Sequence, residues 1–295
     1  MGYLFLLLSK ISGIVKMTAI KNCGNIASGA KNSVKINLLR SLGCVLVAAV
    51  VSFSSGFSGM NESGIWITLA SGISNGVLLF FWILAIARAP MYLVEVFSML
   101  GGVVLPLILS PFIIKGESVS LIQWIGVALL FLSMLCLTQR GEGKKITPLA
   151  ILLMCLTGLG NMGAIMTQKL FVTISKGSVA DFQLVTYAVC AAVLAIMLPI
   201  MKITDKKMQN DTPRDKFSAK VLLFIGLAII MTYLSQILST FASARLPSGV
   251  FYPLAYVISM PLVFLVDVIF YKEKITLGNI IGIILVTVSG VLINI

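Results

Sequence analysis

Histidine is absent from this chain, and charged residues are scarce. Only 11% of the 295 residues are charged, whereas 59% are hydrophobic. Without an imidazole, the chain has no His-based general acid or base and no Ser-His-Asp triad. The HExxH motif and the GxxxxGK phosphate-binding motif are also missing, which excludes a zinc protease and primary ATP-driven transport by this chain alone. We therefore expect no enzyme, no catalytic residue and no cofactor.

Cysteines are few and do not form a recognisable metal or redox motif. The five cysteines, an odd number, are Cys23, Cys44, Cys136, Cys155 and Cys190, and most lie within apolar runs. No CxxC spacing occurs. Buried cysteine acting as a small apolar residue is the simplest interpretation, so we expect no metal site.

The shortage of charge is matched by long apolar segments. Soluble domains are about 45–50% apolar and about 25% charged, whereas the mean hydropathy here is +1.07. This excludes a soluble protein and predicts an all-α integral membrane protein with the lipid bilayer as its solvent. Tyr3–Leu8 shows no cleavage site after it and is interpreted as part of the first span, not as a signal peptide. At about 20 apolar residues per span, ten transmembrane helices are predicted: Gly2–Ile20, Asn37–Ser55, Ile65–Ala87, Tyr92–Ile114, Leu121–Thr138, Pro148–Val172, Phe182–Met201, Val221–Ala242, Val250–Phe270 and Gly278–Ile295.

The two halves of the chain resemble each other. A polar turn with Glu117 precedes an apolar run containing Gly126, and Glu273 and Gly282 repeat both features 156 residues later. Because both turns lie at membrane surfaces, they indicate the repeat and are not expected to act on a solute.

The repeat extends over most of the chain. Ser12–Ile20 matches Thr157–Ile165, and Ala87–Pro90 matches Ala244–Pro247. Each half has five spans, which is an odd number. The second half therefore enters the membrane from the face opposite to the one at which the first half began. We therefore predict two inverted five-helix repeats, residues 1–140 and 146–295, an architecture typical of secondary transporters.

The paired helix starts and the two Ala-Arg-x-Pro joints resemble the drug/metabolite transporter superfamily in its ten-helix, EamA-type form. The resemblance covers essentially the whole chain. It implies alternating-access transport of a small organic metabolite, with the first, third and fourth helices of each half around a central cavity and the fifth and tenth spans outside it. The shared motifs carry no information about the ligand, the coupling ion or the oligomeric state.

The net charge of +12 has two interpretations. It could attract nucleic acid, but the basic residues lie in loops beside helices, as the positive-inside rule describes, so no nucleic-acid partner is expected. One face collects most of the Lys and Arg residues, and the other only Lys115, Lys169, Lys176 and Arg245. This bias predicts a multi-pass protein of the cell membrane with both termini outside, whereas the family resemblance implies both termini in the cytoplasm.

Polar residues inside the spans are the candidate solute contacts, because they are costly in lipid and normally face a cavity. Ser9, Ser12 and Lys16 share one face of the first span. Lys16 corresponds to Asn161 in the second half, so both repeats place a hydrogen-bonding side chain at one depth. The alternative for Lys16 is that it reaches the cytoplasmic interface. Lys10, nearer the centre of the span, needs a partner or water.

Glu95 and Asp267 are the only carboxylates within the predicted spans. Glu95, with Lys16 or Lys10 as a partner, could exchange a proton and couple transport to it. Asp267 is a second coupling candidate, with a solvated interfacial carboxylate as the alternative. The eighth and ninth spans add Gln236 and Tyr256 as cavity residues.

Mixed charge and aromatic groups favour an amino acid or a related polar solute as cargo. The competing hypothesis is a non-transporting membrane scaffold, in which the polar stripes only pack helices.

Overall fold

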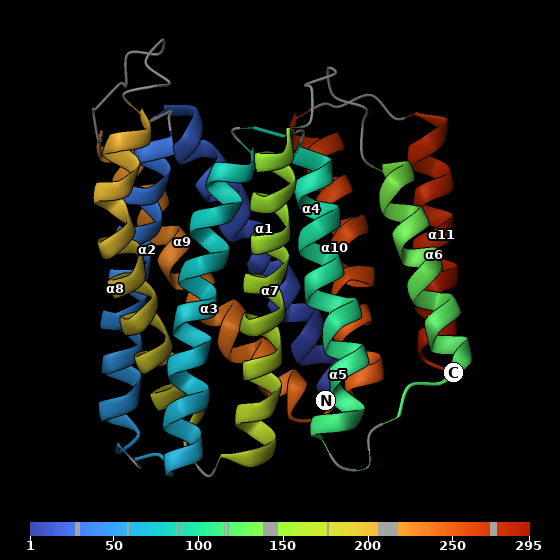
Figure 1. The fold of residues 1–295 in the computed structure, drawn as a ribbon, viewed down its shortest axis with the longest axis horizontal. Helices are drawn as coiled ribbons and strands as arrows, with labels where there is room; N and C mark the ends of the chain where they lie inside the picture. The colour runs from blue at the N-terminus through green and yellow to red at the C-terminus, as the bar shows by residue number, and fades with distance from the viewer. Residues whose placement is uncertain are drawn as a thin grey trace.

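The computed structural model describes residues 1–26, 30–57, 59–86, 88–89, 91–114, 116, 118–137, 147–175, 177–205, 218–271 and 276–295. Within these ranges the regular structure is entirely helical. The helices run side by side across the long dimension of the molecule, and both marked chain ends lie towards the same side (Figure 1). Glu117, Glu273 and the expected boundary between the halves near residue 140 lie outside the described residues.

Among the described residues, each range expected to be helical overlaps helix in the structure, although several ends differ. The elements are α1 (Gly2–Ile26), α2 (Ala30–Ser54), α3 (Glu62–Ile86), α4 (Met91–Met99), the π-helical segment η1 (Leu100–Val104), α5 (Leu105–Ile113), α6 (Leu121–Leu137), α7 (Pro148–Ile174), α8 (Val179–Asp205), α9 (Ala219–Ser243), α10 (Ser248–Tyr271) and α11 (Leu277–Ile293).

Among the described residues, eight helical stretches are long and apolar enough to cross a membrane. They lie on α1, α2, α3, the η1 region, α7, α8, α9 and α10, whereas α6 and α11 are apolar but shorter. Large apolar side chains face outwards: Leu46 is 70% exposed, Phe53 72% and Phe112 84%. Soluble proteins rarely expose apolar surface so extensively. The chain therefore has the features of a multi-pass membrane protein.

The helices are longer than the apolar runs that predicted them. α1 extends to Ile26 instead of Ile20, and α2 begins at Ala30 instead of Asn37. Hydropathy marks where the hydrocarbon ends, but a helix can continue through polar residues into the interface. The segment 21–35, between the first two expected spans, is therefore helical at each of its described residues.

The fourth expected span is not a regular α-helix. Between α4 and α5, the η1 segment widens the turn, and the backbone N–H of Leu105 donates to the carbonyl oxygen of Leu100, five residues back. Pro106 follows directly and has no backbone N–H that could donate a hydrogen bond to a carbonyl oxygen of the preceding turn. Insertions of this kind occur frequently at functional sites.

Contacts between the two halves hold the bundle together. α3 packs along α7, α1 along α9, α2 along α8 and α6 along α11. Small residues allow close approach: a Cβ on Gly160 would lie 2.7 Å from the backbone nitrogen of Leu78, and one on Gly101 would overlap the carbonyl oxygen of Gly158. Such contacts are characteristic of helix packing in lipid, where little apolar surface is removed from water.

Candidate functional site

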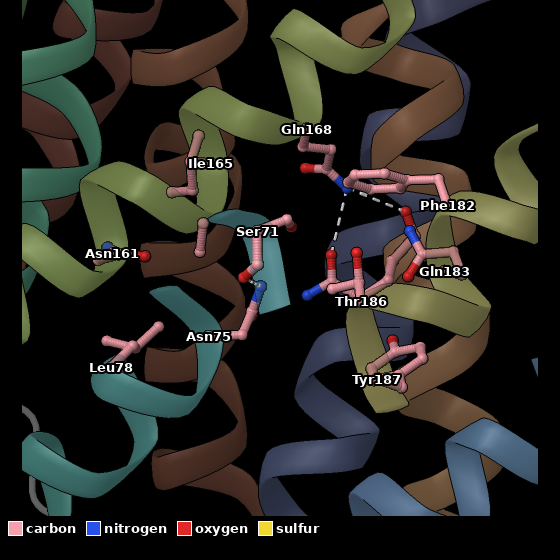
Figure 2. A pocket seen from close by; sticks show the side chains of 12 residues that line it. Ser71, Asn75, Leu78, Asn161, Ile165, Gln168, Phe182, Gln183, Thr186 and Tyr187 are labelled. Atoms are coloured by element: carbon pink, nitrogen blue, oxygen red, sulfur yellow. Dashed lines mark hydrogen bonds between the residues drawn. The ribbon is translucent and has the colours of Figure 1, made fainter. Parts of the chain in front are cut away.

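A polar cavity lies inside the bundle between α3, α7, α8 and α9 (Figure 2). These helices contribute Asn75, Asn161, Gln183 and Gln236 to its wall, respectively. The open space measures about 80 Å³, enough for several waters at roughly 10–15 Å³ each. Pockets for drug-sized ligands are about 300–1,000 Å³. A metabolite of that size therefore requires the surrounding helices to separate.

An amide network joins three helices on one side of the cavity. Gln168 Nε2 of α7 donates to Thr240 Oγ1 at 2.7 Å and to Gln236 Oε1 at 3.2 Å, both on α9. Gln183 Nε2 of α8 donates to the same Thr240 hydroxyl at 3.1 Å. Ser239 Oγ donates to Gln168 Oε1 at 3.2 Å. The network fixes the amide planes, so their remaining polar atoms have defined directions.

A second network surrounds Asn161. Its Nδ2 donates to the backbone oxygen of Ser98 at 2.8 Å and to Tyr256 Oη at 2.7 Å. Ser98 lies one residue before the end of α4, adjacent to η1, and Tyr256 lies on α10. Asn161 thus connects the cavity to the irregular part of the fourth span. A Cβ added to Gly102 of η1 would lie 2.5 Å from Asn161 Nδ2 and 2.6 Å from Tyr256 Oη.

Two buried hydroxyls near the cavity have no hydrogen-bond partner among the described residues. They are Thr186 Oγ1, on the cavity wall, and Tyr233 Oη. Tyr233 packs in a cluster with Tyr187, whose ring also lines the cavity. Buried polar groups are satisfied in more than nine cases of ten. These two hydroxyls therefore mark a place where water or a polar solute can complete the bonding.

The sequence-predicted residues fall in three groups. Asn161 and Gln236 line the cavity, and Tyr256 is joined to Asn161 by the bond described above. Lys16 lies on α1, outside the cavity wall. Glu95 and Asp267 belong to α4 and α10, but their side chains lie outside the described part of the structure.

Lys16 is deeper than its sequence context indicated. The expected end of the first span at Ile20 placed it about a turn from the interface. Because the apolar stretch of α1 continues to Cys23, seven residues follow Lys16 within it, about 10 Å of length. A cavity contact and a side chain that reaches the interface both stay predictions.

Sequence analysis missed the contribution of α8. The expected lining helices were the first, third and fourth of each half, whereas α8, the second helix of its half, supplies Gln183, Thr186 and Tyr187. Their spacing of three and four residues puts them on one face of a helix. That polar stripe was available as a signal, but it lies within an otherwise apolar run.

Lys169 was assigned to a surface, but it is 6% exposed within α7. Its Nζ donates to the carbonyl oxygens of Ser243 at 2.9 Å and Leu246 at 2.6 Å. These oxygens lie at the C-terminal end of α9, where a cation is favoured by unpaired carbonyls and by the helix dipole. Lys169 therefore has a structural role.

No protein-family model matches the chain, and no curated protein matches it. One similar solved structure, described as "Crystal structure of protein", aligns with 99% of this chain and 95% of its own, with a TM-score of 0.68 and 13% sequence identity. At this identity the similarity establishes the fold alone.

Proposed function

We propose that this chain is a secondary transporter that moves a small polar metabolite across the cell membrane by alternating access. The observation that carries the proposal is the amide-lined cavity within the bundle, with the unbonded Thr186 hydroxyl on its wall. Polar groups are costly inside a membrane and typically face a substrate path. A cavity too small for a metabolite fits a carrier in a closed state, which opens by rearranging its helices.

The proposed architecture is ten spans in two inverted five-helix repeats, of the EamA type. The helix contacts support it: if α1 corresponds to α7 and α3 to α9, then the α1–α9 and α3–α7 pairs are the same contact with the halves exchanged. The α2–α8 and α6–α11 pairs each join corresponding helices. These two pairs lie at opposite ends of the long dimension in Figure 1. A two-fold axis that passes through both of these pairs lies perpendicular to the helices. Rotation about it exchanges the two halves and reverses the direction of their helices, as in an inverted repeat.

Proton coupling through Glu95, with Asp267 as the second candidate, belongs to the same proposal. Asp181, whose side chain the structure does describe, accepts a hydrogen bond from Ser52 and is 0% exposed. Asp181 lies in the first turn of α8, where an acidic residue is favoured by the helix dipole. It therefore has a structural explanation, which leaves Glu95 as the better coupling residue.

Liposomes that contain the purified protein and a mixture of small metabolites test the transport function directly. A restricted set of solutes is expected to leave these liposomes faster than protein-free ones, as measured by mass spectrometry of the external medium. Asn161→Leu should slow that release, because it removes both the cavity amide and the bond to Tyr256. Asn294→Leu, at the exposed end of α11, is the matched control. Equal release from protein-containing and protein-free liposomes would favour the scaffold hypothesis.

A further inference from the structure

Three basic side chains lie within the membrane-spanning parts of α1 and α2. Arg40 is nine residues inside the apolar stretch Lys31–Ser54, and Lys16 is seven residues before the end of Gly2–Cys23. At 1.5 Å per residue these depths are about 13 and 10 Å. Lys10 lies deeper still in the same stretch of α1. All three are therefore well inside the helices.

Lys10, Lys16 and Arg40 make no hydrogen bond or ion pair within the part of the chain that the structure describes. Arg40 is only 7% exposed as a whole residue. Lys169 shows what a structural cation looks like in this fold, because it is bonded to two carbonyl oxygens. A lone charge at a helix centre costs roughly 2.5–3.5 kcal/mol on insertion scales. Among the residues that the structure describes, no contact offsets that cost for Arg40.

Lys16 and Arg40 approach the same part of α9 from two sides. α1 runs along α9 from the Ser9–Ser235 bond to the Cys23–Val221 bond, so Lys16 lies level with the region around Ile229, which contacts Gly43 and Cys44 of α2. Cys44 is one helical turn after Arg40 and packs in one buried cluster with Tyr187, which lines the cavity. The unbonded Tyr233 hydroxyl lies beside Tyr187 in the same buried cluster.

We infer that the transported solute carries an oxyanion, a carboxylate or a phosphate, which binds Arg40 and Lys16 on the Tyr187 side of the cavity. The inference rests on the proposed transport function and names its substrate class. A guanidinium presents parallel N–H donors that match two oxygens of either group. The hydroxyls of Thr186 and Tyr233 supply neutral donors nearby. The neutral polar remainder of the solute then faces the amides of Gln168, Gln183 and Gln236.

Thermal unfolding of the full-length protein in detergent tests the binding step. The probes are succinate with neutral succinamide, glycerol 3-phosphate with glycerol, and tetramethylammonium as a cation. At least one oxyanion should raise the melting temperature, while its neutral counterpart and the cation leave it unchanged. A shift with succinate alone assigns a carboxylate, and one with glycerol 3-phosphate alone assigns a phosphate. Absence of a shift with both oxyanions overturns the inference.

Arg40→Gln should weaken binding of the active oxyanion by roughly ten- to one-hundred-fold, the usual effect of hydrogen bonds to a charged group. Without ligand it should melt no lower than the parent protein, because no described residue bonds to the Arg40 side chain. Lys220→Gln, at an exposed position on α9, makes the same charge change and should leave affinity intact. Equal affinities of the two variants overturn the inference. If Arg40→Gln fails to fold, Arg40→Lys replaces it in this test. This variant keeps the positive charge but loses the parallel N–H donors of the guanidinium, so it should bind the oxyanion with intermediate affinity.

Flux through the liposomes described above separates this inference from the transport function. Oxyanion binding that depends on Arg40, without release of any solute, contradicts transport and supports the anion site. Release confined to neutral or cationic solutes, at equal rates for Arg40→Gln and the parent protein, supports transport and overturns the anion site.

Discussion

Asn161 Nδ2 lies 2.7 Å from Tyr256 Oη, and the two side chains meet over the bare backbone of Gly102. The contact brings together α7, α10 and the π-helical turn of the fourth span. A methyl group at Gly102 would lie too close to both polar atoms, at 2.5 and 2.6 Å. The geometry of this bond therefore depends on a residue without a side chain.

Gly102→Ala is expected to displace Asn161 and Tyr256 and to reduce solute release several-fold. The atoms that must move are the ends of side chains, so the loss of stability should be small, on the order of 1 kcal/mol. Gly226→Ala on α9 is the matched control, because no atom lies within 4 Å of its added Cβ. Alanine in an open helix interior should stabilise by roughly 0.5–1 kcal/mol. Equal release rates from the two variants would contradict the proposed role of the contact.

Gln168→Leu should lower the free energy of unfolding by about 1–3 kcal/mol, because it leaves buried hydrogen-bonding partners on α9 unpaired. Thr240→Val removes the hydroxyl that accepts from both Gln168 and Gln183. The double variant should therefore be less destabilised than the sum of the single variants, as residues in one network usually are. Denaturation curves for the three variants measure this coupling. Strict additivity would show that the amides act independently.

Lys169→Met should destabilise the fold by about 1.5–3 kcal/mol or more, since it removes two charge-assisted bonds at the end of α9. Lys220→Met changes the same residue type at an exposed position and should leave the melting temperature nearly unchanged. This result would distinguish the structural cation Lys169 from Arg40, whose replacement should not destabilise the protein. A stable Lys169→Met protein would show that the carbonyl oxygens have other adequate partners.

Glu95→Gln keeps the shape of the side chain but cannot exchange a proton. If Glu95 couples transport to protons, this variant should lose the acceleration of uptake by an imposed pH gradient, while exchange of solute without a gradient persists. Dye-reported proton flux and labelled-solute uptake measure the two quantities separately. Asp267→Asn is the comparison at the second candidate position. Unchanged pH dependence of uptake in Glu95→Gln would refute the coupling role.

Membrane orientation distinguishes the two expectations drawn from sequence. The bias of Lys and Arg predicts that Ile295 lies outside the cell, whereas the family resemblance predicts the cytoplasm. Fusions after Ile295 to a reporter active only in the cytoplasm and to one active only outside it decide between them. Activity of the cytoplasmic reporter alone would overturn the prediction from charge.

The helical layout could be predicted because the membrane imposes one simple rule. An apolar run of about 20 residues marks a span, and α7 at Pro148–Ile174 and α9 at Ala219–Ser243 lie close to their expected ranges. Helix ends were predicted less well, as α1 and α2 show, because polar residues do not stop a helix. The η1 segment gave only the indirect signal of Pro106 after two glycines.

The candidate site was less predictable because it depends on which helices meet. Asn161 and Gln236 were accessible to pattern reasoning, since polar residues in apolar runs are conspicuous. The polar residues Gln183 and Thr186 of α8 were accessible in the same way, but their place at the cavity was not, because nothing in them indicates that α8 packs against α3 and α9. Arg40, three residues inside the expected span Asn37–Ser55, gave no signal of its burial. Its burial follows from tertiary packing.

The close backbone contact between Gly160 and Leu78 limits how the cavity can open. Because α7 and α3 come from different halves and touch without intervening side chains, separating them would break their tightest packing. The bodies that move should then each combine helices of both halves, with α7 travelling with α3 and α1 with α9. Cross-links between α3 and α7 should therefore leave transport intact. Cross-links that join the α3–α7 pair to the α1–α9 pair should stop transport.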